Sequence, residues 1–272
     1  MRILFLGDVV GRSGRDAIVA GIPKLRSQLR LDLVVANCEN ATQGRGITKN
    51  HAVALFAAGI DCMTLGDHAF DQRELISSIS SEPRMLRPMN IAHAAPGRGY
   101  GIFQDSRKRK LLVIAALGRI FMGQPYNDPF QAVNQLLEAH PLGGSVHAIL
   151  IDFHAEATSE KMAMGHHCNG RATLVAGTHT HVPTADCTIM SGGTAYISDV
   201  GMCGNYDSVI GVNKDEPLSR FVTGMHRKRF EPAVGEASLC GVLVESDDRT
   251  GLARSVEPVR IGGTITPALP GT

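Results

Sequence analysis

Ile3-Leu4-Phe5-Leu6-Gly7-Asp8 sets the folding pattern of the chain: four apolar residues followed by a glycine and a carboxylate. An uninterrupted apolar run of this kind predicts a strand buried on both faces, as in a parallel sheet covered by helices. Apolar residues then recur at helical spacing over Asp16–Arg30, and a second apolar run, Leu33–Ala36, ends in Asn37-Cys38-Glu39-Asn40. Strand, helix and strand therefore follow one another from the first residues of the sequence.

The alternation continues through a third unit. A helix is predicted over Thr48–Ala58 with Thr48 as its N-cap, a strand over Cys62–Leu65, and a further helix over Asp71–Ser80. The strand runs into Gly66-Asp67-His68. Strands that alternate with helices favour a parallel sheet with right-handed crossovers.

Strands dominate the rest of the chain, with one predicted helix over Pro129–Ala139. They are predicted at Asn90–Ala92, Gly101–Gln104, Leu111–Ala116, Ala148–Phe153, Thr173–Ala176, Thr188–Met190, Ala195–Ser198, Leu239–Glu245 and Ala253–Ile261. The basic run Arg107–Lys110 falls between two of these strands and is predicted to be a solvated hairpin tip. Consecutive strands with few helices predict a second, mixed sheet packed on the first. We expect one domain over residues 1–272, with a small tail from about Gly262.

The composition narrows the classes of partner. Hydrophobic residues make up 43% of the 272 residues, and 27 basic side chains balance 26 acidic ones. A neutral balance gives no electrostatic reason to expect nucleic acid or a membrane surface. Tryptophan is absent and aromatic residues are 5%, which argues against stacking platforms for single-stranded nucleic acid. We expect neither a stable nucleic-acid complex nor a membrane partner.

The cysteines and the N-terminal run bear on the compartment. None of the six cysteines forms a C-x-x-C pair, so the sequence does not support a zinc knuckle or a thioredoxin-like motif. The first apolar run stops at Asp8, too short for a signal peptide or a membrane helix. We expect a cytoplasmic protein whose reduced thiols serve as small buried hydrophobes.

Acidic, amide and imidazole side chains follow successive predicted strands. They are Asp8, Glu39, Asn40, Asp67, His154, His179 and His181. Because the carboxyl ends of neighbouring parallel strands lie at one edge of a sheet, these side chains should converge. Mixed oxygen and imidazole ligands suit manganese, iron, zinc or nickel better than calcium or magnesium. The group predicts a two-metal centre that hydrolyses a phosphoester.

Two details of this centre can be predicted. Glu39 is the expected bridging carboxylate. His179 and His181 alternate along an extended segment, so a regular strand would point them in opposite directions. A bend or a tight loop must bring both to the ions, and Gly177, just before them, would permit it. The other histidines lack a strand-end setting and are expected at the surface or in local hydrogen bonds; they are His51, His93, His140, His147, His166, His167 and His226.

Other interpretations of these loops stay open at this point. A single Asp or Asn after a strand is commonly a helix cap or an Asx turn, and a lone histidine is usually a satisfied polar residue. Gly7–Arg15 follows a strand and opens a helix, as dinucleotide fingerprints do, but it contains neither G-x-G-x-x-G nor Gly-Lys-Ser/Thr. Arg12, Arg15 and Arg45 lie in glycine-flanked loops and are candidate phosphate contacts.

Long runs of the chain resemble the calcineurin-like metallophosphoesterases, and specifically their bacterial YmdB-type branch. The matching segments are Gly7–Arg15, Ala36–Ala41, Asp152–Lys161, Gly177–Asp186, Asp199–Met202 and Tyr206–Gly211. The resemblance implies an α/β fold, a four-layer α/β/β/α sandwich of two mixed sheets. It also implies a 2',3'-cyclic-nucleotide 2'-phosphodiesterase that cleaves a small nucleotide substrate with a metal-bridging hydroxide. Relatives tend to self-associate, so a homo-oligomer is expected.

The resemblance also implies a role for each residue of the group. Asp8, Glu39, Asn40 and His181 would hold one ion, and Glu39, Asp67, His154 and His179 the other. Two divalent or trivalent ions are expected, with iron or manganese ahead of zinc or nickel. His68 would stand beside the ions without binding them, and would protonate the leaving sugar oxygen or stabilise the transition state.

One position departs from the family pattern. Asp67 stands where the family usually has asparagine, so Gly-Asp-His replaces Gly-Asn-His. A third carboxylate should keep the metal bound but lower its Lewis acidity. The choice of metal or the rate of hydrolysis would then change. The departure leaves room for a metal-binding regulatory protein with weak or lost catalysis. A broader phosphomonoesterase or nucleotidase on the same scaffold is a further alternative.

Overall fold

The first of two large sheets contains the strands that alternate with helices in the N-terminal part of the chain. A computed structural model describes residues 1–271, and its first sheet has the strand order β14-β13-β1-β3-β4-β5. The bounds are β1 Arg2–Leu6, β3 Leu33–Asn37, β4 Cys62–Thr64, β5 Met85–Leu86, β13 Leu239–Ser246 and β14 Ala253–Ile261. The pairs β1–β3, β3–β4 and β4–β5 are parallel, whereas β13 joins β1 and β14 in antiparallel fashion. The sheet is therefore mixed, with a parallel centre.

The second sheet has the order β10-β11-β9-β8-β7-β6. The bounds are β6 Tyr100–Gln104, β7 Lys110–Leu117, β8 Ala148–His154, β9 Leu174–Thr178, β10 Thr188–Ile189 and β11 Ala195–Ile197. Its centre, from β7 through β8 and β9 to β11, is parallel, and antiparallel strands close both edges. A small parallel pair joins β2 (Asp8–Val9) to β12 (Met202–Cys203).

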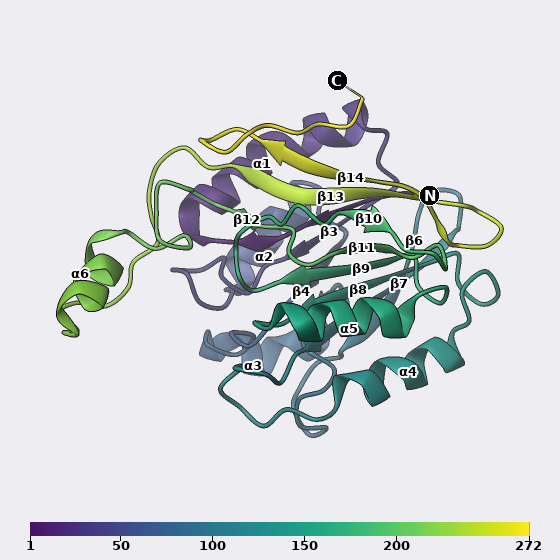
Figure 1. Cartoon of the computed structure of the whole chain (residues 1–272), viewed down its shortest axis with the longest axis horizontal. Helices are drawn as coiled ribbons and strands as arrows, with labels where there is room; N and C mark the ends of the chain where they lie inside the picture. Colours follow the sequence, from purple (N-terminus) through teal and green to yellow (C-terminus); the bar gives the residue numbers. More distant parts are fainter. Residues whose placement is uncertain (272) are drawn as a thin grey trace.

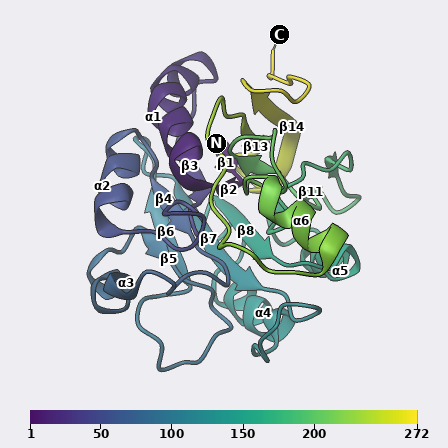
Figure 2. The ribbon, with the colours of Figure 1, turned by 90° about the vertical axis from the view of Figure 1, so that its left-hand side faces the viewer.

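Helices cover the outer faces of both sheets. The bounds are α1 Gly11–Gln28, α2 Lys49–Ala57, α3 Arg73–Ser78, α4 Pro129–Ala139, α5 Thr158–Cys168 and α6 Asp215–Thr223, with a 3-10 turn at Ile79–Ser81. Figure 1 shows α1 above the first sheet and α4 and α5 below the second, while α6 stands apart from the layers. Figure 2 shows α1, α2 and α3 together on one side of the sheets.

Three hydrophobic cores separate these four layers, and the alternation of side chains along each strand decides which core a residue enters. In β1, Ile3 and Phe5 enter the core between the two sheets, whereas Leu4 and Leu6 pack in the core that includes Ile18 of α1. Along β7 the same alternation sends every second residue to the core that contains residues of α4 and α5. Strands buried on both faces explain the uninterrupted apolar runs of the sequence. The predicted four-layer α/β/β/α sandwich of two mixed sheets is confirmed.

Three of the secondary-structure predictions are wrong. Asn90–Ala92 is a turn, because the Asn90 amide takes the place of a strand partner: its Oδ1 accepts from the Leu117 backbone N at 2.8 Å, and its Nδ2 donates to the Leu117 carbonyl at 2.8 Å. The final two strands, β13 and β14, extend the first sheet instead of the second. Helices α5 and α6 interrupt a region in which few helices were expected.

The basic run between β6 and β7 also differs from its prediction. Arg109 is buried, and its guanidinium lies 2.7 Å from Asp32, 2.6 Å from Asp105 and 2.7 Å from Asp248. These carboxylates come from three separate parts of the chain, so the hairpin tip is tied to the body of the molecule. A solvated tip is therefore wrong for Arg109, since a buried cation needs such partners.

Two compositional expectations can be compared with the structure. Five cysteines are buried and Cys187 is half-buried, and all six are free thiols, as expected of small hydrophobes. No helix within residues 1–271 combines the length and apolar character needed to cross a bilayer.

Candidate metal centre

The seven predicted side chains come from five strand ends, and the structure brings them together. Asp8, Glu39–Asn40 and Asp67 lie just beyond β1, β3 and β4 of the first sheet. In the second sheet, His154 is the last residue of β8 and pairs in register with Thr178, after which His179 and His181 follow. Because the central strands of each sheet are parallel, their carboxyl ends lie at one edge. The two edges together supply the cluster.

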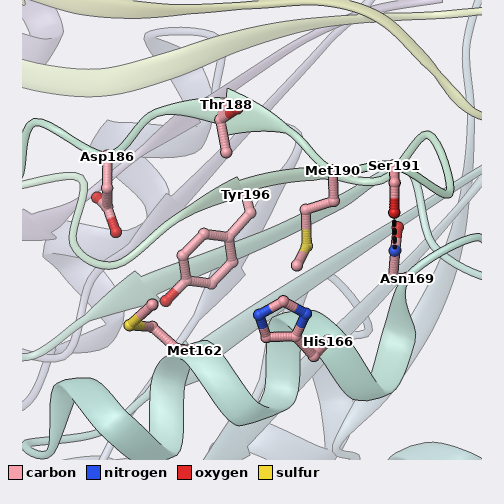
Figure 3. A pocket seen from close by; sticks show the side chains of 8 residues that line it. All are labelled: Met162, His166, Asn169, Asp186, Thr188, Met190, Ser191 and Tyr196. Atoms are coloured by element: carbon pink, nitrogen blue, oxygen red, sulfur yellow. Dashed lines mark hydrogen bonds between the residues drawn. The ribbon is translucent and has the colours of Figure 1, made fainter.

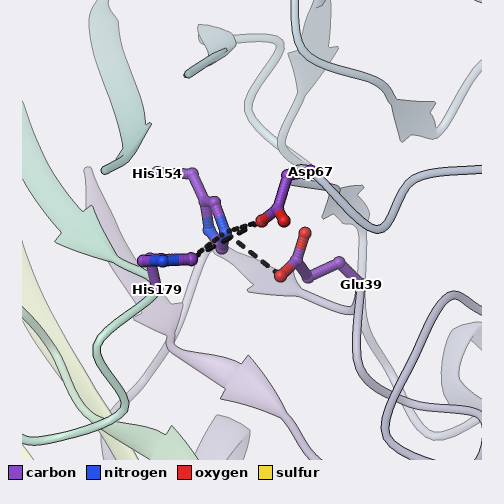
Figure 4. A group of neighbouring side chains, drawn as sticks. All are labelled: Glu39, Asp67, His154 and His179. Carbon is purple, nitrogen blue, oxygen red and sulfur yellow. Dashed lines mark hydrogen bonds and ion pairs between the residues drawn. The ribbon is translucent and has the colours of Figure 1, made fainter. Parts of the chain in front are cut away.

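Four of these residues converge on one point. One ligand atom from each of Glu39, Asp67, His154 and His179 lies within 4.8 Å of the others (Figure 4). His154 Nε2 is 3.0 Å from Asp67 Oδ1 and 3.1 Å from Glu39 Oε1. His179 Nδ1 is 2.9 Å from His154 Nε2. Carboxylate oxygens and imidazole nitrogens at this spacing form a donor set for a transition metal.

The remaining three residues, Asp8, Asn40 and His181, form a second donor set beside these four. Glu39 belongs to the first set and also contacts the second. Asn40 Nδ2 lies 3.2 Å from Glu39 Oε1 and 3.2 Å from His181 Nε2. Asp8 Oδ1 is 3.8 Å from His181 Nε2 and 3.7 Å from His154 Nδ1. A single carboxylate shared by two adjoining donor sets is the arrangement expected around a bridged pair of ions.

The seven side chains suit a bound cation because one buried carboxylate oxygen among them has no partner in the protein. Asp8 Oδ1 is buried without a hydrogen-bond partner, an arrangement that is costly unless something else satisfies the oxygen. Burial also raises the pKa of Asp8. At Gly66, a Cβ would lie 2.2 Å from Glu39 Oε2 and 2.4 Å from His154 Nε2. Glycine at this position keeps the space between the carboxylate and the imidazole open.

Glu39, Asp67 and His154 shift one another's pKa values. Burial opposes the ionisation of Glu39, but the His154 ring beside it lowers the pKa of the carboxyl. The pKa of Asp67 is lowered well below its usual range, since hydrogen bonds to His154 and His179 outweigh burial. Burial alone would lower the pKa of His154, and Glu39 and Asp67 raise it instead. The carboxylates thus favour a positive charge at this point.

Hydrogen bonds fix which nitrogen of two histidines faces the cluster. His181 Nδ1 lies 2.7 Å from the Ile210 carbonyl, which only accepts, so this nitrogen carries the proton and Nε2 is left to bind. His154 Nδ1 lies 2.9 Å from Thr178 Oγ1, which itself donates to Asp152 Oδ1 at 2.7 Å. His154 therefore donates through Nδ1 and presents Nε2 to Glu39 and Asp67. Outer partners of this kind orient the ligands of metal sites.

Asp152, missed in the sequence, lies under the cluster. Its carboxylate is buried and also accepts from Asn37 Nδ2 at 3.0 Å and Thr64 Oγ1 at 2.5 Å. Burial raises its pKa to about 6. The signal that could have revealed it is a lone acid inside the apolar run Ala148–Phe153, because a buried carboxylate needs partners.

The predicted bend of the His-x-His segment occurs, but not at Gly177. Gly177 stays in β9, where a Cβ would lie 1.8 Å from the Ser198 carbonyl oxygen. The chain turns instead at His179 and His181, whose φ angles are 95° and 66°. Left-handed backbone at residues other than glycine costs about 1–3 kcal/mol each and is typical of functional sites.

His68 lies beside the cluster, half-buried. Its backbone N donates to Glu39 Oε2 at 3.1 Å, and its Nδ1 is 3.1 Å from Asp71 Oδ2. The candidate arginines differ in their surroundings. Arg15 donates to the Ala41 carbonyl, Arg45 lies 3.8 Å from Asp71, and Arg12 is exposed. Arg45 thus shares a carboxylate with His68.

A separate hollow of about 300 Å³ lies between α5 and the segment that carries β10 and β11 (Figure 3). It is lined by Met162, His166, Asn169, Asp186, Thr188, Met190, Ser191 and Tyr196. None of these residues belongs to the cluster, and the hollow plays no part in the chemistry considered below.

Comparison with known proteins gives a consistent assignment. Residues 4–259 match the family model described as YmdB-like protein. The chain is 41% identical over 261 residues to the 2',3'-cyclic-nucleotide 2'-phosphodiesterase of Bacillus subtilis (strain 168), with 96% of this chain and 97% of that protein covered. The matched range includes every residue of the cluster, and the family resemblance of the sequence is confirmed.

Two solved structures share the fold. A hypothetical protein from Thermus thermophilus has a TM-score of 0.89 at 39% identity, with 97% of this chain and 100% of that chain covered. A novel phosphatase from Mycoplasma pneumoniae has a TM-score of 0.89 at 34% identity, with coverage of 96% and 93%.

The hydroxyl of Thr178 should matter for metal affinity. Thr178→Val keeps the shape of the side chain but leaves His154 Nδ1 and Asp152 Oδ1 without their common partner. We expect Mn²⁺ affinity, measured by competition with a chelator, to fall by about tenfold or more. Thr178→Ser keeps the hydroxyl and should bind as the native protein does. Equal affinity in the valine and serine variants would contradict this role.

Proposed function

The chain belongs to the YmdB-like family, and on that premise we propose that it is a metal-dependent phosphodiesterase that hydrolyses 2',3'-cyclic nucleotides at the 2'-phosphoester bond. The supporting observation is the shared position of Glu39 between two donor sets that leave Asp8 Oδ1 unpartnered. Such a site offers little to a structural core and suits two-metal hydrolysis. The named activity of the Bacillus subtilis relative supplies the substrate class.

The seven side chains divide between two ions in this proposal. Asp8, Asn40 and His181 would hold one ion, Asp67, His154 and His179 would hold the other, and Glu39 would serve both. Iron or manganese is proposed ahead of zinc or nickel, since the donors mix oxygen and imidazole nitrogen. When bound, the ions would supply Lewis acidity to the phosphoryl oxygens and lower the pKa of the attacking water.

The protein's own groups position the substrate and move the proton. Asp71 lies 3.1 Å from Nδ1 of His68, which orients the ring and leaves Nε2 as the atom that delivers a proton. We propose that this proton goes to the 2'-oxygen as the bond to phosphorus breaks, so that a 3'-phosphate remains. We also propose that Arg45, which lies 3.8 Å from the same Asp71 carboxylate, contacts the phosphate.

Removal of the shared carboxylate tests the proposed activity as a whole. Glu39→Gln should abolish turnover of 2',3'-cyclic nucleotides and reduce the metal bound per chain, since one group serves both ions. Glu138→Gln, on the exposed face of α4, is the matched control and should leave both quantities unchanged.

A substrate panel separates the alternatives. Preferential release of a 3'-phosphate from 2',3'-cyclic nucleotides supports the proposal. Faster hydrolysis of nucleoside monophosphates would identify a phosphomonoesterase instead. Metal binding without turnover of any substrate would identify a regulatory protein.

The proposed role of His68 predicts a dependence on the leaving group. His68→Ala should lower kcat for 2',3'-cyclic nucleotides by about 10²–10⁴-fold, because an alkoxide leaves poorly without a proton. A bis(4-nitrophenyl) phosphate ester, whose leaving group is stable as an anion, should lose much less, and the metal content should not change. Equal losses with both substrates would exclude His68 as the proton donor.

The acid at position 67 predicts a difference in pH dependence. Asp67 Oδ1 lies 3.0 Å from His154 Nε2, so the carboxylate is within the donor set. Asp67→Asn removes one negative charge, and the attacking water should become more acidic. We expect the acidic limb of the pH–rate profile to move to lower pH, with altered metal preference. Identical profiles over pH and metal titrations would contradict this effect.

A further inference from the structure

An ion pair that takes no direct part in the cluster lies completely buried behind it. Lys161 of α5 places Nζ 2.9 Å from Asp199 Oδ2, and both side chains are 1% exposed. Taking two charges out of water costs free energy that their mutual attraction often fails to offset. A pair at this depth is therefore weak support for stability, and its contacts indicate another role.

Those contacts lead directly to the His-x-His turn. Asp199 Oδ2 accepts from the backbone N of Thr180 at 3.1 Å and from its Oγ1 at 2.7 Å. The other oxygen, Oδ1, accepts from Gly201 N at 2.8 Å. The Asp199 backbone is itself held by Thr184, whose N donates to the Asp199 carbonyl at 3.0 Å. The Asp199 carboxylate is therefore fixed in place and holds Thr180, the residue between the two histidines.

The turn needs these hydrogen bonds because the backbone is strained at both neighbours of Thr180. His179 and His181 have φ angles of 95° and 66°, and residues in this region persist only where their surroundings dictate it. The backbone of each histidine is also held by a hydrogen bond. His179 N donates to Asp8 Oδ2 at 3.1 Å, and the His181 carbonyl accepts from Tyr206 Oη at 3.2 Å. Thr180, bound to Asp199, lies between these two contacts in the chain.

The strand beside Lys161 is shaped to admit it. At Gly177 of β9, a Cβ would lie 2.9 Å from Cδ of Lys161 as well as against Ser198. The glycine therefore lets the aliphatic stem of the lysine pass close to the strand that ends at the histidine turn. In α5, Glu160, Lys161, Met164 and Gly165 share the buried face, so a charged residue occupies what would ordinarily be a core position.

We propose that Lys161 and Asp199 are positioning residues for the metal centre. The Asp199 carboxylate, neutralised by Lys161, holds Thr180 and so fixes the His179–Thr180–His181 turn in the conformation that presents one histidine to each ion. The proposal rests on the metal centre of the proposed function. The geometry of the two histidines then depends on the Lys161–Asp199 ion pair, which lies outside the donor sets.

Metal affinity in Lys161→Met tests the proposal. This variant leaves Asp199 buried and uncompensated, and its Mn²⁺ affinity by chelator competition should fall by about 10–100-fold. Arg109→Met is the matched control, because it also removes a buried cation from carboxylate partners. Arg109 precedes β7, whose opposite end pairs with His154, so it lies at the far edge of the sheet. Its loss should lower thermal stability and leave Mn²⁺ affinity within about twofold of the native value.

A milder variant keeps the proposal testable if Lys161→Met does not fold. Thr180→Val removes the hydroxyl that Asp199 accepts, whereas Thr180→Ser keeps it. The valine variant should weaken Mn²⁺ binding and change the visible absorption spectrum of the Co²⁺-loaded protein, and the serine variant should restore both. If Lys161→Met or Thr180→Val binds Mn²⁺ as Arg109→Met does, the positioning role is overturned. If the native protein itself binds no Mn²⁺, the proposed metal centre fails first and this inference falls with it.

Discussion

Mutual repulsion among Asp8, Glu39 and Asp67 is the constraint on which the rest of the structure depends. Asp8 and Glu39 are buried, and Asp67 is half-buried beside them. Carboxylates held this close destabilise a fold unless positive charge is placed among them. The histidines supply part of that charge, and one oxygen of Asp8 still has no partner. A pair of cations would offset the remainder, so the same arrangement that costs stability would give the site its affinity for metal.

The four-layer architecture keeps these groups in place. Two sheets, whose central strands are buried on both faces, bring five strand ends together, and three apolar cores hold the sheets against each other and against the helices. Buried polar residues, among them Asp152, Thr178 and Asp199, lie beside the cluster. Thr178 donates to Asp152 and lies against His154, and Asp199 accepts from Thr180 between His179 and His181. Rigidity therefore comes from the sheets, and precise orientation comes from hydrogen bonds.

The sequence was a good guide where local pattern and function coincide. Each of the seven cluster residues follows or ends an apolar strand, so both strand and side chain could be recognised together. Helix α5 could not, because its buried face carries Glu160, Lys161 and Gly165, which hide the apolar period. The place of β13 next to β1 and the burial of Arg109 depend on partners far away in the chain. The bend at His179 depends on contacts with Asp8 and Asp199 that no local pattern records.

The central claim is that scattered strand-end residues enclose a pair of ions around one shared carboxylate. The most direct measurement is the metal bound to purified protein, by elemental analysis combined with anomalous diffraction from its crystals. The account predicts two ions per chain, with anomalous peaks on either side of the Glu39 carboxylate. Peaks elsewhere in the molecule, or a protein that takes up no transition metal when it is offered, would contradict it.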